Sequence, residues 1–355
     1  MRITGVEAWL VAMRLARPYT ASYDTVEATT NVFLRVLTDR RLVGYGCAAP
    51  DEHATGETTD AMLEKIHTIV APLLKGADPL RPALLLEQLR QPLADEPSIR
   101  AAVDMALLDI LGKKCDAPLW KLLGGYRDRM MTSVTVGILS ERETVIQARE
   151  WVGRGFRILK LKGGIHAESD AARVLKVRES VGEGIALRFD ANEGYSVEEA
   201  LWFIDKTAPA KLELLEQPTR KNLLDLLGQV TRQGSVPVMA DESLGTLRDA
   251  FRLARNDLVD MLNVSLMKVG GVAEARQINA VAKSARLEVM VGCLDESALG
   301  IAAGLHFALS DRNVGYADLD GHLDLAGDPA AGAVTIEDGT LFPSDQPGLG
   351  FELRG

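Results

Sequence analysis

The sequence predicts an α/β protein, a parallel barrel of alternating strands and helices joined to a smaller α+β domain. Three observations indicate this fold: strand signals followed by helical signals in the first third, eight short apolar runs separated by helical stretches beyond residue 130, and a charged residue at the end of most runs. The 355 residues also exceed the usual size of a single hydrophobic core. We therefore expect a large domain and a smaller one.

The N-terminal region has the pattern of an α+β domain. The alternating segment Asn31–Leu37 precedes Thr38–Arg41, which suits a hairpin turn. Further along, Ala101–Leu111 carries apolar residues at helical spacing. We expect residues 1–124 to form this smaller domain and the turn-rich tail, about residues 335–355, to return to it.

The barrel is predicted over residues 125–334, where short apolar runs alternate with helical stretches. An open doubly wound sheet is the alternative, but no GxGxxG motif follows a strand, so its usual signature is missing. The eight runs are Thr132–Gly137, Phe156–Lys162, Ala186–Asp190, Leu212–Glu216, Val236–Asp241, Met261–Leu266, Glu288–Gly292 and Val314–Asp318.

Composition limits the partners and the compartment. A net charge of −10 argues against nucleic acid or an anionic membrane as the main partner. The cysteines, Cys47, Cys115 and Cys293, are far apart and form no CxxC motif, so neither a disulfide framework nor a zinc site is expected. The first residues alternate like a strand and do not resemble a signal peptide, and no apolar run reaches the roughly 18 residues that span a bilayer. We expect a cytoplasmic protein that forms a homo-oligomer.

Charged residues follow consecutive strands at a spacing of about one strand-helix unit. Any single one has a simple structural explanation, since an Asp after a strand often caps a helix and a Lys there is often solvated. Repetition at consecutive strand ends instead favours a shared site, because the carboxyl ends of barrel strands form the active face. The residues are Lys162, Asp190, Glu216, Asp241, Lys268, Asp295 and, at the eighth strand, Asp318 and Asp320.

Asp190, Glu216 and Asp241 lie on three adjacent predicted strands. Carboxylates crowded in a partly desolvated mouth repel one another unless a cation joins them. Oxygen ligands without His or Cys favour Mg²⁺, with Mn²⁺ as a substitute. We therefore predict a magnesium site at these strand ends.

Lys162 and Lys268 follow the second and sixth strands, which face each other across an eight-stranded barrel. This placement suits removal of a proton from one face of a carbon and its return to the other face, which inverts the centre. Lys160 lies on the same strand face as Lys162 and can lower its pKa by like-charge repulsion. The metal would stabilise the enediolate that forms when a proton leaves the carbon α to a carboxylate.

The ordered motifs resemble the enolase superfamily, in its muconate-lactonising-enzyme subgroup. They are Lys160-X-Lys162, Asp190-Ala-Asn192, Glu216-Gln-Pro, Ala240-Asp241-Glu-Ser and Met267-Lys268. A lysine base combined with Mg²⁺ is this superfamily's known pattern. The resemblance implies a modified (β/α)₇β barrel under a split cap, with Asn192 supporting the metal ligands and cap loops near residues 17–24 and 50–57 closing the site.

Asp318-Leu-Asp320 lies across the predicted mouth from the metal. An Asp-X-Asp here resembles the dipeptide epimerases, in which the pair binds the α-ammonium of the dipeptide. Thr135, on the first strand, is also expected to contact the substrate. The predicted function is therefore dipeptide epimerisation at the α-carbon beside the carboxylate.

The expected specificity follows from the cap loops. Ala-Glu epimerases place an arginine in the first cap loop, whereas the matching residue here is Tyr23. Asp51 and Glu52 lie on the second loop and Asp295 follows the seventh strand. Charge complementarity then favours a cationic, polar or hydrophobic second residue over glutamate.

Five other functions remain open. Muconate cycloisomerase and o-succinylbenzoate synthase share the lysines and the metal site but need no ammonium-binding pair, and an N-acylamino-acid racemase binds an uncharged nitrogen. A Schiff-base lysine, as in barrel aldolases, would leave the three carboxylates unexplained. A barrel kept as a metal-dependent binding module would bind ligand without exchanging its α-proton.

Overall fold

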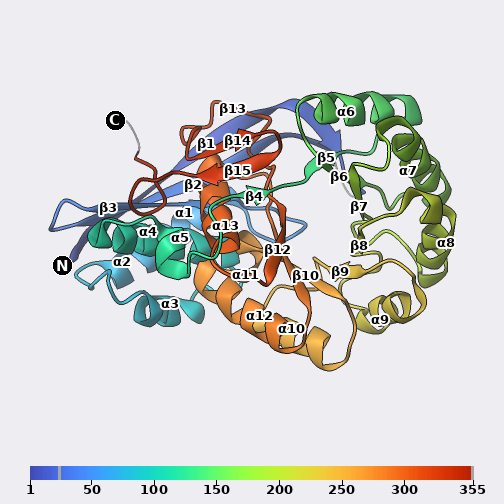
Figure 1. The fold of residues 1–355 in the computed structure, drawn as a ribbon. Helices are drawn as coiled ribbons and strands as arrows, with labels where there is room; N and C mark the ends of the chain where they lie inside the picture. The colour runs from blue at the N-terminus through green and yellow to red at the C-terminus, as the bar shows by residue number, and fades with distance from the viewer. Residues whose placement is uncertain (23–24, 353–355) are drawn as a thin grey trace.

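The computed structural model describes residues 1–22 and 25–352, and a parallel eight-stranded sheet lies at its centre (Figure 1). Every strand lies within or coincides with a predicted apolar run, and the strands neighbour one another in chain order. The strands are β5 (Val134–Val136), β6 (Ile158–Lys162), β7 (Ala186–Asp190), β8 (Leu214–Glu216), β9 (Val238–Ala240), β10 (Met261–Ser265), β11 (Glu288–Gly292) and β12 (Val314–Asp318).

Helices connect each strand to the next and cover the outside of the sheet (Figure 1). Their starts follow local rules: Ser140 and Ser196 each form a capping box with a glutamate three residues on. The helices are α6 (Glu141–Gly153), α7 (Ala167–Val181), α8 (Val197–Thr207) with the 3₁₀ turn η2 (Ala208–Ala210), α9 (Leu224–Gln233), α10 (Leu247–Arg255), α11 (Leu266–Val269), α12 (Val272–Ser284) and α13 (Ala298–Ala308).

The sheet closes between its first and last strands. Ser133 N, just before β5, donates to Ala317 O of β12 at 3.1 Å. The buried Arg188 of β7 reaches the same carbonyl oxygen from inside, with Nη1 at 2.9 Å. Because strands alternate with helices and the series ends on a strand, the predicted (β/α)₇β barrel is confirmed.

A second unit covers the barrel on one side (Figure 1). Its antiparallel sheet has the order β13-β1-β2-β3, and Leu37 pairs with Val43 across the predicted turn. The strands are β1 (Ile3–Thr20), β2 (Thr25–Thr38), β3 (Val43–Ala48) and β13 (Leu325–Ala326). The helices are α1 (Thr59–Lys65), the π-helical η1 (Ile66–Val70), α2 (Ala71–Leu74), α3 (Pro82–Arg90), α4 (Pro97–Cys115) and α5 (Leu119–Leu123).

Strand β3 and helix α4 approach each other backbone to backbone. A Cβ added to Gly44 would lie 2.0 Å from the carbonyl oxygen of Ala106, and one on Gly46 would lie 1.9 Å from that of Ala102. Only glycine permits this separation. Strand β3 therefore lies directly on helix α4 and buries the face of the helix that carries Ala102 and Ala106.

The end of the described chain returns to this unit. A small sheet joins β14 (Val334–Glu337), β15 (Thr340–Pro343) and β4 (Met130–Met131). Beyond it, Leu349 N donates to the buried carboxylate of Asp109 on α4 at 2.8 Å. None of the described helices has both the length and the apolar character needed to cross a membrane.

Candidate active site

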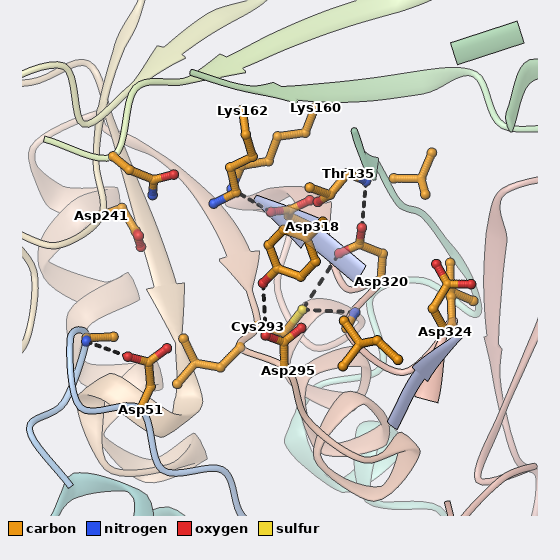
Figure 2. A pocket seen from close by; sticks show the side chains of 18 of the residues that line it. Asp51, Thr135, Lys160, Lys162, Asp241, Cys293, Asp295, Asp318, Asp320 and Asp324 are labelled. Atoms are coloured by element: carbon orange, nitrogen blue, oxygen red, sulfur yellow. Dashed lines mark hydrogen bonds and ion pairs between the residues drawn. The ribbon is translucent and has the colours of Figure 1, made fainter. Parts of the chain in front are cut away.

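A cavity opens at the carboxyl ends of the barrel strands, beneath the cap loops (Figure 2). Lys160 and Lys162 point into it from one side, and Asp51 and Asp295 lie on the opposite side (Figure 2). The predicted site residues that line it are Thr135, Lys160, Lys162, Asn192, Asp241, Lys268, Asp295, Asp318 and Asp320.

Lys160 is buried among carboxylates from three other strands. Its Nζ lies 3.0 Å from Asp190 Oδ2 and 3.0 Å from Glu216 Oε2. The same ammonium donates to Asp318 Oδ2 at 2.8 Å. Burial lowers the pKa of Lys160, but the three carboxylates outweigh burial and raise its pKa well above the usual value. Lys160 is therefore a fixed cation two residues from Lys162.

Lys162 and Lys268 each pair with one of the predicted metal ligands. Lys162 Nζ lies 2.9 Å from Asp190 Oδ2, and Lys268 is ion-paired with the Asp241 side chain and donates to its backbone oxygen at 3.0 Å. Lys162 ends β6, while Lys268 follows β10 on α11, four strands away in the sheet order. Both side chains line the same cavity, so a molecule held there lies between two amines.

The three predicted metal ligands share one edge of the sheet. Asp190 and Glu216 are direct partners in the β7–β8 register, and Asp241 follows β9. Lysines form ion pairs with these carboxylates. Among the described residues, no group of three or more His, Cys, Asp or Glu side chains has the geometry to hold a metal ion.

Their chemistry nevertheless fits a hard cation. Burial raises the pKa of Glu216 to about 8, and its Oε2 atom lies 3.0 Å from the Lys160 ammonium. Burial alone would also raise the pKa of Asp190, but Lys160 and Lys162 hold it below the usual value. Buried carboxylates of this kind are suitable oxygen ligands for Mg²⁺. The metal would take the place of the lysine ammonium groups that now contact their oxygens.

Asp318 and Asp320 line the cavity from the end of β12. Asp318 accepts from the Ser133 hydroxyl as well as from Lys160. Asp320 Oδ2 accepts the backbone N–H of Thr135 at 2.6 Å, so the structure brings Thr135 next to the acidic pair through its main chain. Burial, with the charge of Asp318, raises the pKa of Asp320 to about 7.

The cap supplies part of the cavity wall. Tyr19 on β1 donates its hydroxyl to Asp295 Oδ2 at 2.8 Å, and burial raises the pKa of Asp295 to about 6. Asp51 lines the same cavity, whereas Glu52 is exposed and lines a neighbouring hollow. Tyr23 lies outside the described residues.

Both cap loops contact the barrel. Ser22 Oγ donates to Asn192 O at 3.0 Å, and Lys221 Nζ donates to His53 O at 3.3 Å. Asn192 also donates through its side chain to Asp190 Oδ2 at 3.3 Å and to Glu242 Oε1 at 3.1 Å. Asn192 therefore supports a predicted metal ligand and is itself covered by the cap.

Sequence reasoning missed two polar residues beside the predicted metal ligands. Glu242 lies beside Asp241, and burial raises its pKa well above the usual value. Asn263 Nδ2 donates to Glu216 Oε1 at 2.7 Å from the middle of β10. A polar residue inside an otherwise apolar run was the available signal for Asn263, and Glu242 was part of the Ala-Asp-Glu-Ser motif.

Two family models match most of the chain. The mandelate racemase/muconate lactonizing enzyme N-terminal domain matches residues 4–124, and the enolase C-terminal domain-like model matches residues 143–355. The chain is 40% identical to an L-Lys-D/L-Arg epimerase of Desulforapulum autotrophicum, over 99% of each chain. It is 37% identical to an L-Ala-D/L-Glu epimerase of Bacillus subtilis, over 99% of this chain and 97% of the relative.

A solved structure extends the likeness to three dimensions. The dipeptide epimerase of Methylococcus capsulatus, complexed with Mg and the dipeptide L-Arg-D-Lys, superposes with a TM-score of 0.94 at 36% identity, over 99% of each chain. These relatives are isomerases that act on dipeptides, in agreement with the class predicted here. The chain belongs to the mandelate racemase/muconate lactonizing enzyme family of the enolase superfamily.

Proposed function

We propose that this protein is a Mg²⁺-dependent dipeptide epimerase that inverts the α-carbon beside the substrate carboxylate. The observation that carries the proposal is the placement of Lys162 and Lys268, which line one cavity from strands four apart. A carbon between them presents a different face to each amine. The epimerase relatives support the same reaction.

The two lysines exchange one proton with the substrate. One lysine, as the free amine, removes the α-proton from its own face, and the other, as an ammonium, donates a proton to the opposite face. The reverse reaction uses the same pair with their protonation states swapped. Lys160 keeps its charge throughout and disfavours a second ammonium at Lys162.

Asp190, Glu216 and Asp241 would hold the metal. Bound Mg²⁺, or Mn²⁺ in its place, would supply positive charge to the substrate carboxylate and make the neighbouring α-proton more acidic. Asn192 orients Asp190 through two hydrogen bonds. Asn263 orients Glu216 through one hydrogen bond.

The acidic pair at β12 would bind the α-ammonium of the dipeptide. Asp320 faces the cavity with a raised pKa, so a nearby cation would favour its charged form. An acylated substrate would bring no such charge. This argues against N-acylamino-acid racemase activity.

The second residue of the dipeptide is proposed to be cationic. Asp51 and Asp295 line the cavity beneath the cap, and Tyr19 fixes one oxygen of Asp295. Two carboxylates in a partly buried wall attract an ammonium or guanidinium and repel glutamate. The L-Lys-D/L-Arg epimerase relative supports this choice.

The experiment is incubation of a mixed dipeptide library in D₂O with Mg²⁺, followed by mass analysis. A gain of one mass unit at the C-terminal residue is expected, largest for lysine and arginine. Lys162→Ala and Lys268→Ala should each abolish epimerisation, although either can still exchange the α-proton of one epimer through the remaining lysine. Normal epimerisation by both variants would contradict the two-base mechanism.

We also propose a cytoplasmic location and a homo-oligomeric assembly. The separated, unpaired cysteines support a reducing compartment. Light scattering of the purified protein tests the assembly, and a mass equal to one chain would contradict it.

A further inference from the structure

The part of the cavity beyond the acidic pair at β12 is called here the distal compartment. Figure 2 shows Asp324 on the far side of Asp320 from Asp51. Residues of β1, α6 and the segment after β12 line this compartment. Its lining residues are Leu15, Arg17, Gln147, Trp151, Leu323 and Asp324.

The distal compartment begins within one turn of Asp320. Leu323 N donates to Asp320 O at 2.9 Å, which folds this segment back on itself. Asp324 O accepts from Ala16 N at 2.7 Å, so the segment is also tied to β1 beside Arg17. These two bonds place the distal compartment next to Asp320.

Three polar atoms of the distal compartment lack hydrogen-bond partners among the described residues. They are Arg17 Nη1, Gln147 Oε1 and Trp151 Nε1. Trp151 is only 1% exposed, and buried polar groups without partners are uncommon in native proteins. Two of these atoms are donors and one is an acceptor.

Formal charges around the distal compartment are already balanced. Arg17 Nε lies 3.6 Å from Asp324 Oδ1, and Arg17 Nη1 lies 3.7 Å from Glu150 Oε2. Arg154 stacks on the Trp151 ring at 4.1 Å and adds a second positive charge. Of these charged residues only Arg17 and Asp324 line the cavity, and they carry opposite charges, so neither a cation nor an anion is favoured.

We propose that the distal compartment receives the side chain of the first residue of the dipeptide and selects an uncharged carboxamide, as in glutamine or asparagine. A carboxamide oxygen accepts from Trp151 Nε1 or Arg17 Nη1, while its NH₂ donates to Gln147 Oε1. All three partnerless atoms are buried in this structure, and the Arg17 guanidinium lies over the Trp151 ring, 4.5 Å from its centroid. This inference rests on the proposed epimerase function.

The first test compares four dipeptides with a common C-terminal arginine: Gln-Arg, Met-Arg, Lys-Arg and Glu-Arg. Met is close to Gln in size but cannot donate. The expected kcat/KM for Gln-Arg exceeds that for Met-Arg by about tenfold, the effect of one or two hydrogen bonds. Faster turnover of Lys-Arg or Glu-Arg than of Gln-Arg would overturn the inference.

Variants of α6 test the named groups. Trp151→Phe keeps a ring and removes the N–H, and Gln147→Leu removes the acceptor. Each is expected to reduce the Gln-Arg to Met-Arg ratio severalfold while Met-Arg turnover persists, so a general loss of stability does not mimic the result. Arg149→Gln, an exposed change on the same helix, should leave the ratio unchanged.

The outcomes separate the two proposals. An unchanged ratio in both α6 variants would overturn the distal compartment alone, since exchange at the second residue would continue. Absence of α-proton exchange with all four dipeptides, in the Mg²⁺-loaded wild-type protein, would contradict the epimerase function itself.

Discussion

Lys160 stays charged inside the barrel because three strands supply carboxylates to it. Asp190, Glu216 and Asp318 all lie within hydrogen-bond distance of its ammonium, and none is adjacent to it in the chain. The predicted metal ligands and the proposed ammonium-binding pair are thereby joined through one lysine. A change at either end alters the electrostatics of the other.

Asp320→Asn tests the ammonium-binding role at the residue scale. Asn can still accept the Thr135 N–H but cannot neutralise a cation. We expect kcat/KM for free dipeptides to fall about 10- to 100-fold, mostly through KM, because a hydrogen bond to a charged group is lost. Steady-state epimerisation kinetics measure the effect.

The matched control for this variant is an N-acetylated dipeptide, which carries no ammonium. Its turnover should not fall further in Asp320→Asn. Equal losses for the free and the acetylated substrate would point to a structural role for Asp320.

Individual site residues could be predicted where they follow the strand period. Asp190, Glu216 and Asp241 end successive strands, so their meeting followed from the barrel alone. The ion pairs of Lys160 did not follow, because its partner Asp318 is 158 residues away and because Lys160 itself contacts Asp190 and Glu216, where the metal was expected. Arg17 and Trp151 carried no signal, since neither ends a barrel strand.

At the element scale, strand β2 holds the loop that carries Asp295. The buried Asn31 donates to Asp295 O at 3.0 Å and accepts from Ser297 N at 2.7 Å. Thr29 donates to the same carbonyl oxygen at 3.1 Å. The cap therefore positions a proposed specificity residue through the backbone as well as through Tyr19.

Asn31→Ala should weaken this connection. The N–H of Ser297 would lose its acceptor, at a cost of about 1–3 kcal/mol in unfolding free energy. We also expect a higher KM for arginine-containing dipeptides as the Asp295 loop loosens. Urea denaturation and kinetics measure the two effects. Thr29→Ala removes the hydroxyl to which Asn31 Nδ2 also donates but leaves both bonds of Asn31 to the Asp295 loop, so it should show smaller effects.

Gly46→Ala should damage the contact between β3 and α4. The added Cβ would meet the Ala102 carbonyl, which cannot rotate away, so strand and helix must separate at a cost of about 1–3 kcal/mol. Thermal denaturation measures the loss. Gly153→Ala on α6, where nothing lies within 4 Å, is the control and should be neutral or slightly stabilising.

The positions of strands and helices were the most predictable feature of this structure. Short apolar runs between amphipathic helices locate parallel strands to within a few residues, because both faces of such strands are buried. The β3–α4 contact was not predicted, although Gly44 and Gly46 lie on one face of a strand. Their partner is a helix more than 50 residues away, so local pattern could not identify it.

For the whole molecule, buried carboxyls around α4 make stability depend on pH. Burial raises the pKa of Asp104 to about 7, of Asp109 to about 6 and of Glu57 to about 7. The folded protein then binds protons that the unfolded chain releases above its pKa of about 4. Their contribution to stability is full below that value and is lost as pH rises from about 4 to 7.

Asp104→Asn should remove part of this dependence. Asn keeps an acceptor for Ala273 N but carries no charge to desolvate. The drop in unfolding free energy between pH 5 and pH 8 should be smaller in the variant than in the wild type. Urea denaturation at both values measures it, and equal drops in the two proteins would contradict the assignment to Asp104.

The return of the chain end to α4 has a consequence for synthesis on the ribosome. Asp109 accepts from Tyr45 N and from Leu349 N, and the second donor is translated 240 residues later. A buried carboxylate without its partners is costly, so the first unit of the protein cannot reach its final form while it is being made. The part synthesised first is thus completed last, and a nascent chain that stalls before residue 349 would lack this hydrogen bond to α4.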